Sequence, residues 1–419
     1  MKTIVLIVIA TGFYITDAYS QNVFNRMKEK AAETAAKKIL RKTEKPVTKN
    51  EENKSGTSAE TNTKQTETVN EEQPVAKLAS YSKFDFVPGE KVLFWEDFSQ
   101  DVIGEFPMHW YTRSKGETVT LNNVTGKWMR MYPGGFLSPL VNMNENYCVE
   151  FDLIIDFPLK GGYMVPAFGL SFYDRGNKAE VFSYDYKMNN NMAFHVTPYR
   201  DDAFVTLSTR DGKPKFEAEK VKLSGFSAKV GKPVHVAVSV QKERVRMWID
   251  EEKAFDVPVA APHPANFNQL KFEMNSSNYT DQQIGYYITN VKVTTGLADL
   301  RNKILQGGNF STTGIRFDPG ADVLRPESFG TINEIAKLLK EDESLKLKIV
   351  GHTDATGNAT DNITLSKKRA SSVIAYLVEE HKIDASRLEA DGKGASSPAA
   401  DNKTPAGKAM NRRVEFIKK

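Results

Sequence analysis

The stretch GHTDATGNATDNITLSKKRASSV, residues 351–373, decides how the last third of this 419-residue chain is organised. It follows residues 345–350, for which a β-strand is expected, and its polar, glycine-containing first half predicts a loop. From about Ile363 to His381, apolar residues recur every three or four positions, which predicts a helix with Asn362 as its N-cap. The residues expected to face the sheet are Ala370, Val373, Ile374 and Leu377.

The segments on either side of this stretch complete an alternating pattern of strands and helices. A short strand is expected at 315–317, and Pro326 suits the first position of a helix that carries an apolar stripe. Strands at 387–391 and 413–417 follow the second helix. The pattern predicts an α/β domain over residues 299–419, with a βαβα order and two helices packed on a small mixed sheet.

Three pieces of sequence, in this order, resemble the OmpA-like C-terminal domain shared by outer-membrane OmpA proteins, peptidoglycan-associated lipoproteins and flagellar stator proteins. They are FDPGADVLRPES (317–328), the stretch 351–373 and ADNKTPAGKAMNRRVEF (400–416). The resemblance covers about 110 residues and is more specific than a lone short motif. It implies binding of the peptidoglycan stem peptide at the zwitterionic end of a diaminopimelate residue.

The resemblance also implies a binding site. Asp354 is expected to receive the ligand ammonium and Arg369 to hold its carboxylate, and the chemistry agrees, because an ammonium favours a carboxylate and a carboxylate favours a planar guanidinium. The alternative is a surface ion pair between these two residues. The other site residues implied are Thr353, Asn362, Leu365, Phe317 and Asp318, whereas Arg412 and Arg413 are expected to be mainly structural.

Residues 84–297 show a different pattern, with short alternating runs between Gly, Pro and Asn turns. The clearest hairpin is VHVAVSV (234–240), a polar turn at 242–243, and VRMWI (245–249). Its alternating apolar residues place one face of each strand on a common core. About ten strands of this kind, without a long helical pattern, predict an all-β jelly-roll sandwich.

The runs FWEDF (94–98) and ITNVKV (288–293) resemble the first and last strands of concanavalin-like jelly rolls, a class that includes lectins and glycosidases. Outer-membrane proteins or glycans are therefore candidate partners of the sandwich. Glycoside hydrolysis needs two carboxylates flanking the bond, and the local pair to weigh is Glu150 and Asp152. Because they alternate with apolar residues, we expect a solvent-facing row rather than a catalytic pair.

The N-terminal region predicts export. Residues 1–20 combine a lysine start, a short apolar run and the small-x-small sequence Ala18-Tyr19-Ser20, as in a secretory signal peptide. Residues 21–42 have a helix-favouring composition, and residues 43–83 form a polar, disordered linker by composition. We expect the protein in the periplasm or at the outer membrane of a Gram-negative bacterium.

Composition narrows the function further. Lys and Arg total 57 and Asp and Glu total 53, so the net charge is +4, which argues against a nucleic-acid-binding protein. The single cysteine, Cys148, excludes an intrachain disulfide and a cysteine-rich zinc site, and we expect neither metal nor cofactor. The prediction is a non-catalytic protein that tethers the outer membrane or a periplasmic assembly to peptidoglycan. The alternative is a wall- or glycan-active hydrolase with a jelly-roll catalytic domain.

Overall fold

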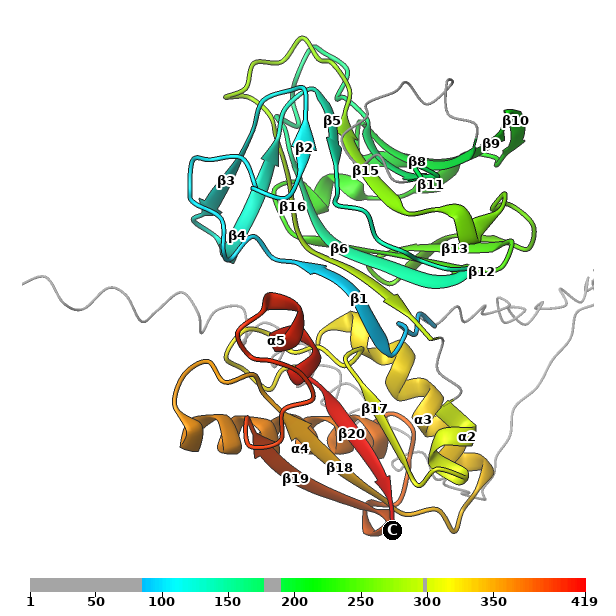
Figure 1. The fold of residues 1–419 in the computed structure, drawn as a ribbon, viewed down its shortest axis with the longest axis vertical. Coiled ribbons are helices and arrows are strands. Elements are labelled where there is room, and N and C mark those ends of the chain that lie inside the picture. Colours follow the sequence, from blue (N-terminus) through cyan, green and yellow to red (C-terminus); the bar gives the residue numbers. More distant parts are fainter. Residues whose placement is uncertain (1–84, 177–189, 297–299) are drawn as a thin grey trace, which may run out of the picture. The chain divides into compact units, whose positions relative to one another are not determined.

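Two sheets of antiparallel strands form the middle of the chain, where the sequence shows alternating patterns (Figure 1). The structure is a computed structural model that describes residues 85–176, 190–296 and 300–419, all of which belong to one compact unit. The expected signal peptide, helical segment and polar linker, which end at residue 83, lie outside the described residues.

The chain crosses between the two sheets several times. The first sheet has the spatial order β14 (Glu252–Val257), β13 (Arg244–Ile249), β12 (Val234–Gln241), β6 (Asn146–Asp156), β16 (Gly285–Thr295), β4 (Val124–Met131) and β3 (Gly116–Leu121), with β1 (Lys91–Glu96) also paired to β16. The second has the order β10 (Lys213–Glu217), β9 (Asp202–Asp211), β8 (Asn190–Tyr199), β7 (Phe168–Tyr173), β15 (Gln269–Met274), β5 (Gly134–Leu137) and β2 (Tyr111–Thr112), with β11 (Val221–Leu223) paired to β9. Two short 3-10 turns, η2 (Phe226–Lys229) and η3 (Pro264–Asn266), lie between strands.

Apolar side chains from both sheets form one core. The predicted hairpin is confirmed as β12 and β13, in which Val236 pairs with Ile249 and Val240 with Val245, all four buried. Between the sheets, Phe151 of β6 meets the Phe272 ring edge-on, with ring centroids 5.1 Å apart. Burying a side chain of this size contributes roughly 1.5–3 kcal/mol, so this core stabilises the sandwich.

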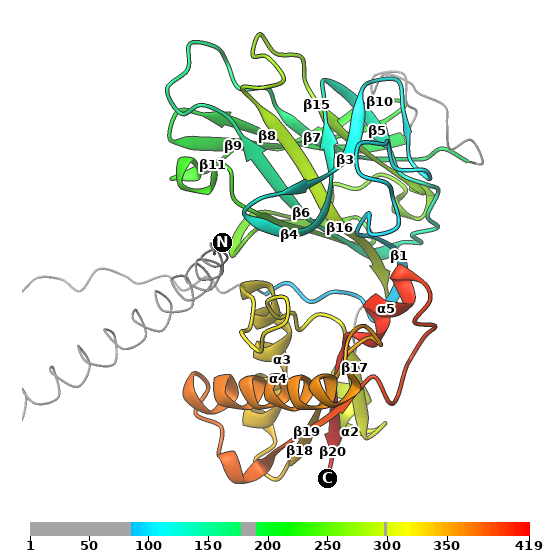
Figure 2. The ribbon, with the colours of Figure 1, turned by 90° about the vertical axis from the view of Figure 1, so that its left-hand side faces the viewer.

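A four-stranded mixed sheet with the order β17-β20-β18-β19 organises the C-terminal domain. Its β18–β19 pair is parallel and its other pairs are antiparallel, and α4 packs across β18 and β19 (Figure 2). An all-β part followed by an α/β domain is confirmed, and the jelly-roll assignment stays a prediction. The elements are α2 (Leu300–Leu305), β17 (Asn309–Thr312), η4 (Pro326–Ser328), α3 (Phe329–Glu341), β18 (Leu347–His352), α4 (Ala359–Glu379), η5 (Ala385–Arg387), β19 (Leu388–Gly394), α5 (Pro405–Asn411) and β20 (Val414–Lys418).

The strand expected at 315–317 is wrong, because the first strand of this domain is β17, several residues earlier. Phe317 makes only an isolated bridge to Leu324. Between them the chain reverses direction at Gly320, whose φ of 69° suits a residue without a Cβ. The segment Ile315-Arg316-Phe317, just before the turn at Pro319-Gly320, therefore belongs to a loop.

The helix cap also differs from the expected residue. The side-chain oxygen of Asn358 accepts hydrogen bonds from the amides of Thr360 and Asp361, at 2.8 and 3.3 Å, so Asn358 is the N-cap of α4. Asn362 lies inside the first turn. Both asparagines are good capping residues, and the fold selects the one at which the loop ends.

Residues 85–90 fill the space between the first sheet and α3. Phe86 packs on Trp248 with ring centroids 5.2 Å apart, in a buried cluster that includes Cys148. Gly330 of α3 permits this approach, because a Cβ there would lie 1.9 Å from the Phe86 carbonyl oxygen. The outer face of the first sheet is therefore covered here rather than exposed.

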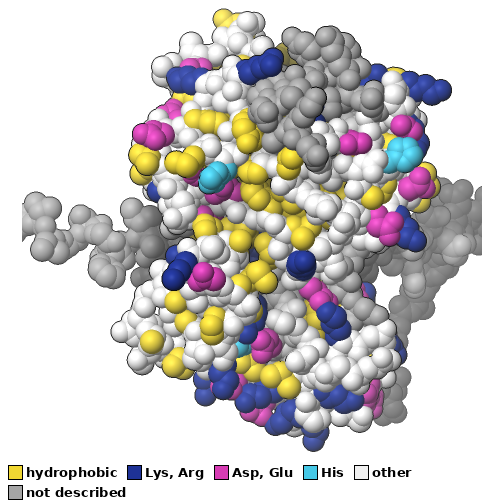
Figure 3. Space-filling model, viewed as in Figure 1, with side chains coloured by type: hydrophobic (Ala, Val, Ile, Leu, Met, Phe, Trp, Pro, Cys, Tyr) yellow, Lys and Arg dark blue, Asp and Glu magenta, His cyan; other side chains and the backbone are white. Residues whose placement is uncertain are grey.

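Charged side chains of both signs share the molecular surface. On the face drawn in Figure 3, Lys and Arg lie among Asp and Glu, particularly over the C-terminal domain, and do not form one basic stripe. Among the described residues, no helix combines the length and the apolar character needed to cross a membrane.

Candidate functional site

Asp354 lies in the loop that leads from β18 into α4. Its Oδ2 accepts a hydrogen bond from Arg412 Nη1 at 2.6 Å, and its Oδ1 accepts one from the Thr356 amide at 2.9 Å. Burial by itself raises the pKa of Asp354, but the hydrogen bonds from Arg412 and Thr356 outweigh burial, and the net pKa is lowered. Asp354 is therefore a carboxylate at neutral pH, with 14% of its side chain exposed.

Arg369 projects from the middle of α4. Its Nε donates a hydrogen bond to the Ala321 carbonyl oxygen at 2.9 Å, and its guanidinium lies 5.0 Å from the centroid of the Phe317 ring. Burial lowers the pKa of Arg369, and the positive charge of nearby Arg412 lowers it further. Since arginine titrates above about 12, Arg369 stays a cation whose position is fixed by a carbonyl and a ring.

Arg412 completes this charged group, although its match to the family suggested a mainly structural role. Arg412, not Arg369, is the ion-pair partner of Asp354. Its guanidinium also lies 5.4 Å from the centroid of the Trp95 ring on β1, and 36% of its side chain is exposed. The adjacent Arg413 is buried and pairs with Glu415. The two neighbouring arginines look alike in the sequence, and only the fold gives them different partners. We call Asp354, Arg369 and Arg412 the charged site.

Two residues implied by the resemblance lie on the loop beside Arg369. Phe317 is half-buried and supports the Arg369 guanidinium. Asp318 is exposed, and its carboxylate lies 3.5 Å from Arg325 Nε. The structure therefore brings Phe317 next to the charged site and places Asp318 on its outer edge.

Three others lie around the start of α4. The Asn362 side-chain amide donates to the Thr356 carbonyl oxygen at 2.9 Å, which braces the loop that carries Asp354. Thr353 is buried directly before Asp354, and Leu365 is half-buried on α4. These residues shape the loop and the helix face.

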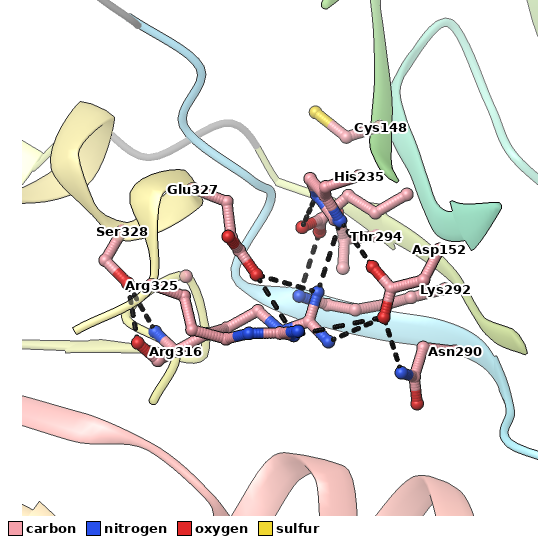
Figure 4. Close-up of polar contacts among 12 residues, drawn as sticks. Cys148, Asp152, His235, Asn290, Lys292, Thr294, Arg316, Arg325, Glu327 and Ser328 are labelled. Atoms are coloured by element: carbon pink, nitrogen blue, oxygen red, sulfur yellow. Dashed lines mark hydrogen bonds and ion pairs between the residues drawn. The ribbon is translucent and has the colours of Figure 1, made fainter. Parts of the chain in front are cut away.

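The side chains of Glu150 and Asp152 are buried, with 3% and 5% of their surface exposed, so the expected solvent-facing row is wrong. Asp152 points from the outer face of β6 toward Arg316 and Arg325 of the C-terminal domain (Figure 4), and Glu150, two residues earlier on the strand, lies on the same face. Apolar residues of β6 do face the sandwich core, but on the opposite face the C-terminal domain occupies the place of solvent. Enclosed in this way, the two carboxylates cannot flank a glycosidic bond.

Glu150 is held by cations from neighbouring strands. Its Oε2 lies 2.9 Å from Lys292 Nζ, and its Oε1 lies 3.6 Å from His235 Nε2. A bulge in β16, where Asn290 has a φ of 54°, keeps Lys292 opposite Glu150. Burial raises the pKa of Glu150, but Lys292 and His235 outweigh it and bring the pKa to about 2.

Asp152 has partners from both domains. His235 Nδ1 lies 2.9 Å from its Oδ1, and the Asn290 amide donates to its Oδ2 at 2.7 Å. Arg316 Nη2 and Arg325 Nη1, from the C-terminal domain, lie 3.6 and 3.9 Å from the same Oδ2. Burial raises the pKa of Asp152, but the cations outweigh it and the pKa is strongly lowered.

His235 and Glu327 complete this group. Burial lowers the pKa of His235, but the neighbouring carboxylates of Asp152 and Glu150 outweigh it and raise the pKa to about 9. Glu327 Oε1 lies 3.5 Å from Arg316 Nη1 and 3.3 Å from Arg325 Nη1. We call the set the buried charge network; its members are Glu150, Asp152, His235, Lys292, Arg316, Arg325 and Glu327.

A metal centre is not found in the part of the chain that the structure describes, where no group of three His, Cys, Asp or Glu side chains is placed to hold an ion. The buried carboxylates instead face ammonium, imidazolium and guanidinium groups of the chain itself.

Comparison with known proteins places the C-terminal segment in a family. The OmpA family matches residues 316–412, which confirms the OmpA-like resemblance for this part of the chain. "Probable lipoprotein YiaD" of Escherichia coli (strain K12) is 39% identical over 102 residues, which cover 24% of this chain and 46% of that protein. "Peptidoglycan-binding protein ArfA" of Mycobacterium bovis is 37% identical over 121 residues, which cover 29% of this chain and 36% of that protein. The chain thus spans less than half the length of either relative.

Among solved structures, the peptidoglycan-associated lipoprotein from Burkholderia pseudomallei is 26% identical to this chain. The match covers 26% of this chain and 89% of that one, with a TM-score of 0.24.

Proposed function

We propose that this protein is a non-catalytic component of the bacterial cell envelope that binds peptidoglycan through residues 299–419. The observation that carries the proposal is the charged site, which brings a carboxylate and two guanidinium groups together beside the first turns of α4. The site lies within the segment that matches the OmpA family, and one relative of that segment is named a peptidoglycan-binding protein.

The proposed ligand is the stem peptide, held at the zwitterionic end of diaminopimelate. Its ammonium would bind Asp354, whose two oxygens keep acceptor capacity beyond their bonds to Arg412 and Thr356. Its carboxylate would bind Arg369, with Arg412 close by. The resulting contacts are charge-assisted hydrogen bonds, which contribute roughly 1.5–3 kcal/mol each.

The proposed location is the periplasm or the outer membrane of a Gram-negative bacterium, reached through the predicted signal peptide. The polar linker at 43–83 would give the folded part reach, and the sandwich, proposed as a jelly roll, would present a surface to outer-membrane proteins or glycans. Binding of one stem is expected to be weak, since association itself costs about 4–15 kcal/mol. Many copies facing one polymer would make the attachment strong.

Co-sedimentation of the full chain with purified peptidoglycan sacculi tests the proposal. Asp354→Ala and Arg369→Ala should each lower binding severely, because each leaves a ligand charge unpaired at a cost of about 2–5 kcal/mol. Lys367→Ala removes an exposed cation from the same helix and is the matched control, which should bind like the parent. If both site variants fold and sediment with sacculi as the parent does, the assignment is wrong.

Ligand chemistry provides a second arm. Soluble stem peptides that carry diaminopimelate should bind more tightly than otherwise identical peptides that carry lysine, because only diaminopimelate supplies the additional carboxylate for Arg369. Equal affinity for both peptides would contradict the diaminopimelate assignment. Binding to peptidoglycan in general would then be judged by the sacculus assay alone.

A further inference from the structure

The loop beside Arg369 is closed on itself by backbone hydrogen bonds. We call residues 317–324 the rim loop. The Asp318 amide donates to the Val323 carbonyl at 3.0 Å, and the Arg325 amide donates to the Arg316 carbonyl at 3.0 Å. Because the Ala321 carbonyl accepts from Arg369, the position of the rim loop sets the position of that guanidinium.

Both ends of the rim loop are anchored on the sandwich. Arg316 directly precedes the loop and Arg325 directly follows it, and both guanidinium groups converge on Asp152 Oδ2, at 3.6 and 3.9 Å (Figure 4). Asp152 is itself held by His235 and Asn290, on two other strands of the first sheet. A loop joined to the sheet through two arginines on one fixed carboxylate has little freedom to shift.

A second link leads from the sandwich to the other side of the charged site. Trp95 of β1 lies opposite Lys292 of β16 and carries Arg412 over its ring. Arg412 in turn donates to Asp354 at 2.6 Å. Two independent contacts of the sandwich therefore reach the two residues proposed to hold the ligand.

We infer that the β-sandwich positions the peptidoglycan site, with Asp152 acting on Arg369 through the rim loop and Trp95 acting on Asp354 through Arg412. The inference rests on the proposed function. Asp152 and Trp95 are positioning residues, since neither lies at the proposed ligand. Holding the charged groups in place before binding lowers the ordering cost that association must otherwise overcome.

The charged contact between Asp152 of the sandwich and Arg316 and Arg325 of the C-terminal domain is suited to positioning the rim loop. Apolar residues of similar volume would hold two domains together at least as well as a buried ion pair. They would not attract guanidinium groups toward one point, whereas the Asp152 carboxylate attracts those of Arg316 and Arg325. The network thus accounts for the direction in which Arg316 and Arg325 leave the rim loop.

The test uses the full chain and two measurements. Titration calorimetry with the soluble tripeptide L-Ala–γ-D-Glu–meso-diaminopimelate measures affinity, and amide hydrogen exchange without ligand measures the mobility of the rim loop. Asp152→Asn should weaken affinity about five- to tenfold and speed exchange of the Asp318 and Arg325 amides by a similar factor, since coupling between sites starts at about fivefold. Trp95→Ala should weaken affinity about two- to fivefold, as expected for a cation–π contact.

Matched controls come from the far sheet. Asp202 forms an exposed ion pair with Lys222 at 2.8 Å, and Tyr199 lies 5.2 Å from the Arg200 guanidinium. Asp202→Asn and Tyr199→Ala should change neither measurement. If Asp152→Asn does not fold, Arg325→Lys, which keeps the charge but loses the planar fork, takes its place with the same expectation.

The outcomes separate the two claims. If folded Asp152→Asn or Arg325→Lys, together with Trp95→Ala, keep parent affinity and parent exchange, the positioning inference is wrong. If the parent binds no tripeptide, the proposed stem-peptide ligand is wrong, and the exchange rates of the ligand-free variants then decide alone whether the sandwich anchors the rim loop.

Discussion

Asp354 and Asp152 are both aspartates beside arginines, but they differ in access to water. Asp354 has 14% of its side chain exposed, and its partner Arg412 has 36%. Asp152 has 5%, and four donors from two domains surround it. Both carboxylates have a lowered pKa and are charged at neutral pH.

Because of this difference, the Asp354–Arg412 pair is able to exchange partners with a ligand, whereas the buried pairs of Asp152 are not. A partly exposed ion pair contributes about 0–1 kcal/mol, so a ligand ammonium or carboxylate competes for its members at little cost. Removing one member of a buried pair strands the other charge without water. The charged site is suited to binding, and the buried charge network to holding parts of the chain in place.

The largest expected effect comes from breaking the buried side of this comparison. Lys292→Met strands the Glu150 carboxylate and should lower the free energy of unfolding by about 3–5 kcal/mol, measured by urea denaturation. Lys222→Met, which breaks the exposed pair with Asp202, is the control and should cost less than about 1 kcal/mol. The double variant Lys292→Met/Glu150→Gln should recover much of the loss, and equal losses for the two single variants would refute the contrast.

The pH dependence of stability provides a second test. The pKa of His235 is raised to about 9 by Asp152 and Glu150, against an unfolded value of 6.5, while Glu327 and the cation Arg316 also face it. A raised pKa stabilises the fold fully below pH 6.5, and this contribution is lost as the pH rises through 9, by a few kcal/mol. Thermal melts from pH 6 to 10 should show this fall, and His235→Gln should flatten it. A parent that gains stability across this range would contradict the assignment.

The smallest effect is expected at the charged site. Arg412→Gln should change the free energy of unfolding by less than about 1 kcal/mol, because its pair with Asp354 is partly exposed. The pKa of Asp354 should nevertheless rise, since burial favours the neutral acid and the main opposing hydrogen bond is lost. Carbon-detected NMR titration of the Asp354 carboxyl group measures the shift. The control is Arg244→Gln, which breaks the exposed pair with Asp256 and should leave the pKa of Asp354 unchanged. An unchanged pKa of Asp354 in Arg412→Gln would show that Arg412 does not set that pKa.

Local periodicity predicted most of the secondary structure. The valines of 234–240 mark β12 because alternation places every second residue in the core, and the apolar spacing after 363 marks α4. The prediction failed at 315–317 and at the cap of α4, where neighbouring residues offered equally good local choices. Loop geometry decided between them.

The sequence by itself determined the class of the C-terminal domain and pointed to Asp354 and Arg369, because a family motif and complementary charge are properties of residues along the chain. Only the tertiary structure decided that Glu150 and Asp152 are buried, that Arg412 rather than Arg369 pairs with Asp354, and that Trp95 lies against that arginine. Each of these facts depends on which distant segment covers a given face. An alternating strand carries the same pattern whether its polar side meets water or the charges of another domain.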